Sequence, residues 1–188
     1  MLCLIGGIAR SGKSTLAERL RERYGFAWFP LDALKMGLFL GAPEFGVHPD
    51  HPDLDTADRL WPVIKGLAEN ILFDGRNYVI EGVNLRPGTV ARFMDETDEP
   101  IRACFLGYPG LTAAQKARLV ASAAGGPNDW LSDKTEAYIL DYLAGCCSRS
   151  AAMQEASEAA GLPFFDTGAD FQGGLTAAER FLVGAQAR

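Results

Sequence analysis

The chain has 188 residues, of which 48% are hydrophobic and 22% are charged, as expected for one ordinary globular domain. Its 18 basic and 24 acidic residues give a formal net charge of −6, which argues against general nucleic-acid binding because that function needs a basic surface. No apolar run approaches the ~20 residues that span a bilayer, and no signal-peptide pattern precedes the first strand, so we expect no membrane partner and a cytoplasmic location.

Apolar runs and glycine positions predict the first elements. The run Leu2–Gly6 ends at glycine and is typical of a strand buried on both faces. Residues 13–23 carry leucine and alanine at helical spacing, and Gly25 stands where a C-capping glycine is expected. Phe26–Pro30 is predicted to be the second strand. Residues 41–56 are rich in glycine, proline and aspartate, which predicts an irregular loop.

Strands and helices continue to alternate along the rest of the chain. The remaining predicted elements are an amphipathic helix over 60–72, the strands Tyr78–Gly82, Ile101–Gly107 and Pro163–Asp166, and a last helix near 174–186. This alternation favours an α/β fold in which helices cover a parallel sheet. We therefore expect residues 1–188 to form one domain.

Residues 108–130 fit this alternation poorly. They contain Lys116 and Arg118, followed by the helix-breaking run Gly125–Asn128. A mobile lid is one interpretation, and a surface helix followed by a loop is the other.

The segment Gly7–Ser14 matches the phosphate-loop pattern G-x-x-x-x-G-K-[ST] at every fixed position and lies between a predicted strand and a predicted helix. The two glycines permit a close approach of the backbone, so that the N–H groups of residues 10–14 converge on phosphate oxygens at the start of the helix. Lys13 is expected to neutralise the β- and γ-phosphates, and the Ser14 hydroxyl is expected to bind Mg²⁺. The predicted nucleotide-binding residues here are Gly7, Arg10, Ser11, Gly12, Lys13, Ser14 and Thr15.

Asp32 lies 18 residues after Ser14, just beyond the carboxyl end of the second strand. In a parallel sheet this end borders the ligand crevice, so the carboxylate is a candidate to accept a proton from an attacking hydroxyl and to orient it. The alternative is that Asp32 is the N-cap of a helix that begins near Ala33.

Two more polar residues follow the third strand. Glu81 ends that strand, where a carboxylate could hold Mg²⁺ through water or bind the substrate, or could be only a polar strand end. Arg86 follows on the same side, and its guanidinium is a candidate to bind a phosphate or carboxylate of the substrate. A solvated surface arginine is the alternative.

On these residues the chain resembles the P-loop small-molecule kinases, among them adenylate and shikimate kinases, chloramphenicol phosphotransferase, zeta-type toxin kinases and 2-phosphoglycerate kinase. Gly7–Ser14 is diagnostic of the superfamily. The segments Leu31–Gly37 and Val79–Val83 are similar to the styles of chloramphenicol phosphotransferase and 2-phosphoglycerate kinase.

The resemblance implies a three-layer P-loop NTPase fold whose five-stranded parallel sheet has the order 2-3-1-4-5. It also implies an acceptor-binding segment at about 33–66 and a lid at about 108–132, in which Arg118 is the candidate catalytic arginine although no R-x-x-R motif is present. Asp32 takes the catalytic-base position. Gly168, in the segment Asp166–Ala169, falls in the region that lines the adenine pocket of such kinases.

Other conspicuous residues have ordinary structural interpretations. His48 and His51 alternate with proline and aspartate as in a solvated turn, although contact with a substrate remains an alternative. Trp130, Phe164 and Phe165 are expected to pack in the core or at a lid hinge. The cysteines at 3, 104, 146 and 147 have no C-x-x-C spacing and predict neither disulfides nor a zinc site.

The sequence therefore predicts an ATP- and Mg²⁺-dependent kinase that phosphorylates a small molecule. A nucleotide-dependent switch or nucleoside-triphosphate hydrolase is the main alternative, but the guanine-recognition motif N-K-x-D of GTPases is missing. A non-enzymatic anion-binding module is a third possibility, and the intact Lys13–Ser14 pair argues against it.

Overall fold

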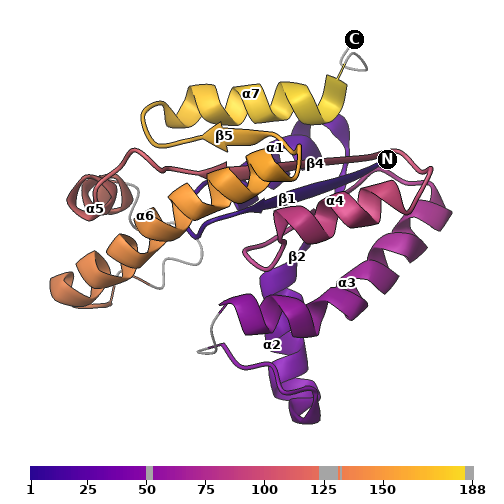
Figure 1. Ribbon diagram of the computed structural model, residues 1–188, viewed down its shortest axis with the longest axis horizontal. Helices are drawn as coiled ribbons and strands as arrows, with labels where there is room; N and C mark the ends of the chain where they lie inside the picture. Colours follow the sequence, from indigo (N-terminus) through magenta and orange to yellow (C-terminus); the bar gives the residue numbers. More distant parts are fainter. Residues whose placement is uncertain (50–52, 123–130, 132, 185–188) are drawn as a thin grey trace.

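A five-stranded parallel sheet with the order β2-β3-β1-β4-β5 forms the centre of the computed structural model (Figure 1). The structure describes residues 1–49, 53–122, 131 and 133–184. The strands are β1 (Leu2–Gly7), β2 (Ala27–Pro30), β3 (Tyr78–Glu81), β4 (Ile101–Gly107) and β5 (Phe164–Asp166). The predicted α/β fold with the strand order 2-3-1-4-5 is confirmed.

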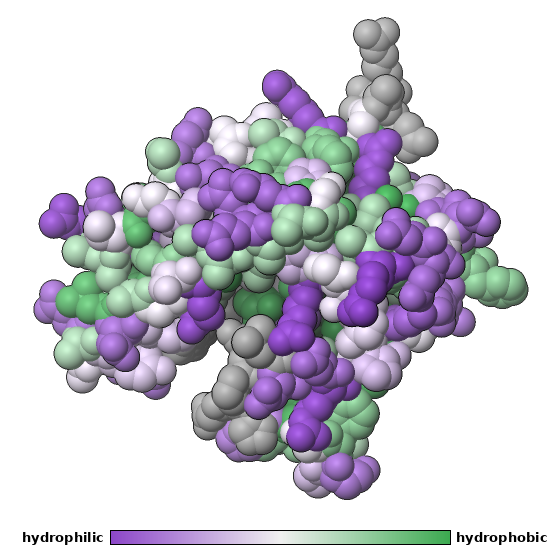
Figure 2. Space-filling view, viewed as in Figure 1, coloured by the Kyte–Doolittle hydropathy of each residue, from purple (hydrophilic) through white to green (hydrophobic). Residues whose placement is uncertain are grey.

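Helices cover both faces of the sheet. On one face, α1 (Lys13–Tyr24) and α7 (Phe171–Val183) pack together, and on the other α3 (Asp53–Asp74), α4 (Pro87–Asp95) and α6 (Glu136–Ala159) contact the central strands. Figure 2 shows hydrophilic side chains mainly over α3 and α4, whereas the outer surface of α6 mixes hydrophilic and apolar side chains. No helix in the described part of the chain has both the length and the apolar character needed to cross a membrane.

The central strands are apolar along their whole length because both of their faces are covered. Cys3 and Ile5 of β1 belong to the apolar cluster beneath α1 and α7, whereas Leu2 and Leu4 belong to the cluster beneath α3 and α4. All six residues of β1 are buried. Successive side chains of a strand point to opposite faces, so a strand between two helix layers needs apolar residues at every position.

The irregular loop predicted for 41–56 is present over 42–49, whereas the prediction is wrong over 53–56, which belong to α3. Helix α2 (Leu31–Gly41) occupies the segment before it, a 3₁₀ turn spans Pro43–Phe45, and α3 begins at Asp53. Residues 50–52 lie outside the described part. The helix predicted over 60–72 is confirmed and extends about two turns further toward the N-terminus. The periodic apolar pattern is missing from these two turns because most of their residues are polar.

Two further helices define the remaining connections. Helix α4 begins with Pro87 at its first position, which proline favours because that N–H has no intrahelical acceptor. Helix α5 (Ala113–Ser122) follows β4, as in the surface-helix interpretation of 108–130. Residues 123–130 and 132, on which the predicted lid and the role of Trp130 depend, lie outside the described residues.

Candidate active site

The carboxyl ends of the three strands β2, β3 and β1 meet at one edge of the sheet, where the sequence predicts the site. The phosphate loop, which we define as Gly7–Ser14, connects β1 to α1. A side chain added at Gly82, just after β3, would put its Cβ 2.7 Å from Cβ of Leu31, the first residue of α2. The start of α2 and the end of β3 are therefore in direct contact beside the loop.

The two fixed glycines of the phosphate loop are required by its backbone. Gly7 has φ 132°, and a Cβ there would lie 2.1 Å from the carbonyl oxygen of Leu106 on β4. Gly12 has φ 94°, and its Cβ would lie 2.9 Å from the ring of Phe171 on α7. Any side chain at either position would need both a rare conformation and a displacement of the neighbouring strand or helix.

Arg10 in the same loop also has a left-handed backbone, with φ 62°. It is the only non-glycine residue with positive φ among the residues that the structure describes. A non-glycine residue in this region costs on the order of 1–2 kcal/mol, and such conformations concentrate where a loop is shaped for binding.

Four consecutive carbonyl oxygens of the loop accept hydrogen bonds, one from Lys13 of the loop itself and three from side chains outside it. The donors are Lys13 Nζ to Ile8 (2.9 Å), Tyr108 Oη to Ala9 (2.7 Å), Lys116 Nζ to Arg10 (2.8 Å) and Thr167 Oγ1 to Ser11 (2.9 Å). The C=O and N–H of a planar trans peptide point in opposite directions. Bonds that hold the Ala9 and Ser11 carbonyls therefore turn the N–H groups of Arg10 and Gly12 to the other side, as a phosphate-binding loop requires.

Lys13, Ser14, Asp32 and Glu81 form a charged cluster beside the loop. Ser14 Oγ donates a hydrogen bond of 3.1 Å to Glu81 Oε1, although Glu81 is only 5% exposed. Burial raises the pKa of Glu81 above its usual value and the charge of Asp32 adds to this, while Lys13 and the Ser14 hydroxyl oppose the shift. The predicted site residues Lys13, Ser14 and Asp32 thus lie within electrostatic reach of Glu81.

Asp32 is the second residue of α2, not its N-cap. The capping position is Pro30, and the helix begins at Leu31. The side chain of Asp32 is 69% exposed and forms an ion pair of 3.1 Å with Lys35, one turn further along the helix. The interpretation of Asp32 as an N-cap is therefore wrong, because the helix begins two residues earlier than the sequence indicates. An exposed carboxylate at this helix start remains available to a ligand.

Lys116 and Tyr108 contact the phosphate loop, and sequence reasoning gave neither a role in the site. Lys116 comes from α5, is 4% exposed, and places its ammonium 4.0 Å from the ring centre of Tyr108. Burial lowers its pKa to about 8, with smaller contributions from Arg10 and Lys13, while Cys147 and Cys146 on α6 oppose the shift. Among the described contacts, Lys116 rather than Arg118 connects α5 to the loop; Arg118 is exposed.

We predict that ATP affinity falls between pH 7 and pH 9.5 because Lys116 loses its charge. Lys116 is mostly protonated below about 8 and mostly neutral above it, and a bound polyphosphate favours the charged form. If the nucleotide raises the pKa of Lys116 by one unit, the affinity changes about tenfold across this range. Titrations of the wild type and Lys116→Met at several pH values measure this effect, and an equally steep dependence in the variant would assign it to another group.

Gly168 lies next to the loop through its neighbour Thr167. Thr167 is 1% exposed, and its hydroxyl is within hydrogen-bond distance of the carbonyls of Ser11 and Gly107. Gly168 is buried, donates its N–H to Asp166 Oδ1 at 2.6 Å, and has Tyr108 as a close neighbour. The predicted adenine-side segment is thus attached to the phosphate loop.

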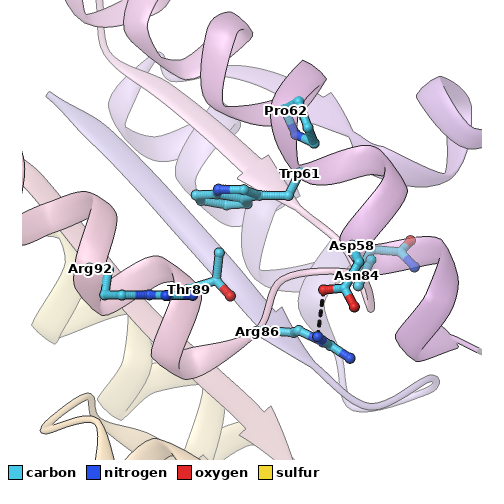
Figure 3. Close-up of a pocket in the computed structure, with 8 residues that line it drawn as sticks. Asp58, Trp61, Pro62, Asn84, Arg86, Thr89 and Arg92 are labelled. Carbon is cyan, nitrogen blue, oxygen red and sulfur yellow. Dashed lines mark hydrogen bonds and ion pairs between the residues drawn. The ribbon is translucent and has the colours of Figure 1, made fainter.

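Arg86 lies between α3 and α4, where its Nη1 forms an ion pair of 2.6 Å with Oδ1 of Asp58 on α3. Both residues line a pocket of about 140 Å³, which we call the α3–α4 pocket (Figure 3). This volume is below the range of whole-ligand sites, so the pocket fits one part of a substrate. Its lining residues are Ala57, Asp58, Trp61, Pro62, Asn84, Arg86, Thr89 and Arg92.

The structure does not support a metal site at the histidine loop within its described part. His48 packs edge-on against Phe39 with 4.7 Å between ring centres, whereas His51 lies outside the described residues. No three His, Cys, Asp or Glu side chains gather into a metal-binding group in the described ranges. Phe165 packs against Phe181 at 6.0 Å, as predicted for a core aromatic residue.

No protein-family model and no curated protein matches the sequence. Among solved structures, the chain is similar to a sugar kinase from Janibacter sp. HTCC2649, with a TM-score of 0.62, 19% identity and coverage of 99% of this chain and 96% of the other. The chain has the fold of the P-loop small-molecule kinases. A gluconokinase from Sinorhizobium meliloti 1021 is also similar, with a TM-score of 0.56, 15% identity and coverage of 96% of this chain and 90% of the other.

A shikimate kinase from Bacteroides thetaiotaomicron shares this P-loop kinase fold, with a TM-score of 0.51, 15% identity and coverage of 97% and 96%. The resemblance to P-loop small-molecule kinases is thereby confirmed for the fold. Similarity at these identities carries no information on the reaction. The function has to be argued from the residues of this chain.

Proposed function

We propose that this protein is a kinase that transfers the γ-phosphoryl group of ATP to a small-molecule acceptor. The observation that carries the proposal is the phosphate loop, whose carbonyls at Ile8, Ala9, Arg10 and Ser11 are held by four side chains so that its amides line the start of α1. A loop whose amides are turned to one side by these bonds needs little reorganisation to bind a polyphosphate.

On the nucleotide side, Lys13 neutralises charge on the β- and γ-phosphates, and Gly168 lies on the adenine side. The hydroxyl of Ser14 and the carboxylate of Glu81, 3.1 Å apart, are hard oxygen donors that fit Mg²⁺ directly or through water. When bound, Mg²⁺ neutralises charge on the phosphate oxygens. Mg²⁺ would also keep Glu81 ionised against the effect of its burial.

On the acceptor side, Asp32 accepts the proton of the attacking hydroxyl and orients that hydroxyl toward the γ-phosphate. Its exposure and its position at the start of α2, next to Glu81, support this role. Phosphoryl transfer requires mostly positioning and charge stabilisation from the protein, so one well-placed carboxylate is sufficient.

Two arginines have proposed roles, one in binding the acceptor and one in contacting the γ-phosphate. Arg86 binds the acceptor in the α3–α4 pocket, where it already lies against Asp58. Arg118 remains the candidate lid arginine for the γ-phosphate, although it is exposed on α5. A small-molecule acceptor agrees with the descriptions of the similar structures as a sugar kinase, a gluconokinase and a shikimate kinase.

A transfer assay with γ-³²P-labelled ATP and Mg²⁺ tests the proposal. A panel of hydroxylated and phosphorylated metabolites should contain at least one that becomes labelled and that stimulates ADP release well above the rate without acceptor. Rapid ADP release that no acceptor stimulates, with labelled inorganic phosphate as the product, would instead favour a nucleoside-triphosphate hydrolase or switch.

A further inference from the structure

The α3–α4 pocket contains buried polar atoms that have no partner in the described structure. Asn84 is 2% exposed, and neither its Nδ2 nor its Oδ1 has a hydrogen-bond partner among the described residues. The Nε of Arg86 is likewise buried and has no hydrogen-bond partner among the described residues. Buried polar groups in folded proteins are paired in the great majority, so an unpaired amide in a pocket wall indicates a partner that binds there.

The location of the pocket connects it to the acceptor side of the proposed reaction. Asn84 and Arg86 follow Glu81 by three and five residues, and Glu81 is hydrogen-bonded to Ser14 of the phosphate loop. Three residues of chain span at most about 11 Å. The Asn84 side of the pocket therefore lies near the same edge of the sheet as the phosphate loop.

The donors and acceptors of the pocket limit the chemistry of its ligand. The guanidinium groups of Arg86 and Arg92 only donate, the carboxylate of Asp58 only accepts, and the amide of Asn84 does both. An anion alone would satisfy the arginines but not the unpaired Asn84 carbonyl oxygen. A neutral polyol would satisfy this acceptor but bring no negative charge to a lining whose residues carry a net charge of +1, from two arginines and one aspartate.

Trp61 supplies an apolar surface at the same place. Its indole packs at 79° against Phe93, with 5.9 Å between ring centres, which fixes the ring between α3 and α4. Figure 3 shows Trp61 and Thr89 on one side of the pocket and Asp58, Asn84 and Arg86 on the other. Such an arrangement can bind the carbon chain of a ligand on the ring and its oxygen atoms on the polar groups.

From these groups we infer that the α3–α4 pocket binds a polyhydroxylated carboxylate, whose anionic group contacts Arg92 and whose hydroxyls contact Asn84 and the Arg86–Asp58 pair. The inference rests on the proposed function in one respect, which is that the bound molecule is the acceptor of the phosphoryl group. The binding itself does not require nucleotide and can be measured separately. One carboxylate matches the net charge of the pocket, whereas a doubly charged phosphate exceeds it.

Four six-carbon probes separate the contributions: gluconate, glucitol, hexanoate and glucitol 6-phosphate. In calorimetric titrations without nucleotide, gluconate should bind at least about tenfold more tightly than glucitol, which lacks the anion, and hexanoate, which lacks the hydroxyls. Equal affinities for gluconate and glucitol, or tighter binding of hexanoate or glucitol 6-phosphate than of gluconate, would overturn the inference.

Variants of the pocket provide the second test. Arg92→Gln should reduce the affinity for gluconate to that for glucitol. The control Arg76→Gln, at an exposed arginine paired with Asp74 before β3, should leave both affinities unchanged. Asn84→Leu should raise the melting temperature, because it removes unpaired buried polar atoms, and should weaken gluconate about tenfold. A purely structural Asn84 predicts the same stabilisation with unchanged affinity, and this result would overturn the inference.

The two proposals fail in different ways. If gluconate binds with these dependences but no acceptor is phosphorylated, the proposed kinase function is wrong and the pocket inference stands. If an acceptor is phosphorylated with a KM that Asn84→Leu and Arg92→Gln leave unchanged, the pocket inference is overturned and the kinase function stands.

Discussion

Replacing Lys13 by alanine is expected to lower kcat/KM for phosphoryl transfer by about 10²–10³-fold, the effect of removing one preorganised charged donor from a transition state. Lys13 is 7% exposed, and its ammonium lies at the phosphate loop, bonded to the Ile8 carbonyl. It is also the main positive charge that opposes the raised pKa of Glu81. Steady-state kinetics with a saturating acceptor, together with calorimetric titration of ATP, measure the loss.

The matched control for this variant is Arg76→Ala. Arg76 forms an ion pair of 2.9 Å with Asp74 just before β3, at the amino-terminal edge of the sheet and so opposite the loop. It should retain full turnover and nucleotide affinity. Undiminished affinity and turnover in Lys13→Ala would remove the phosphate loop from the mechanism.

Changing Asp32 to asparagine is expected to reduce kcat by about 10²–10⁴-fold, the range associated with loss of a general base. Because Asp32 is 69% exposed and contributes only a surface ion pair with Lys35, the stability of the protein should change by less than about 1 kcal/mol. The affinity for ATP should remain close to that of the wild type. Separate measurements of kcat, of the Kd of ATP and of thermal unfolding distinguish these effects.

Asp74→Asn provides the corresponding control at an exposed, ion-paired aspartate before the amino end of β3, at the edge of the sheet opposite the loop. It should leave kcat unchanged. If Asp32→Asn transferred phosphoryl groups at the wild-type rate, the side chain would have no role as a base, and its ion pair with Lys35 would be its only function visible in the structure.

The parts of the fold that the sequence predicts correctly are those with local signals. The apolar run that ends at Gly6 and the loop glycines identify β1 and the start of α1, and every predicted strand is present. The order of the strands follows from the resemblance carried by Gly7–Ser14. Helices with short or mixed patterns were missed or misplaced, among them α4, whose nine residues give only two turns of periodicity.

The site was predicted only where its residues belong to a motif. Lys13 and Ser14 have fixed places in the phosphate-loop pattern, and Glu81 ends an apolar strand. Tyr108 and Lys116 reach the loop across about 100 positions of sequence, with no spacing rule that connects them to it. The sequence identifies Arg86 as a candidate ligand of the substrate but does not indicate its pairing with Asp58, which depends on how α3 packs beside α4.

Amide hydrogen exchange of the phosphate loop tests the central claim most directly. With saturating ATP and Mg²⁺, the amides of residues 10–15 should exchange markedly more slowly than in the free protein, and adenosine with Mg²⁺ should leave them unchanged because it has no phosphates. If ATP slowed exchange only elsewhere in the chain, or if adenosine protected the loop equally, the loop would not be the polyphosphate site and the kinase proposal would be contradicted.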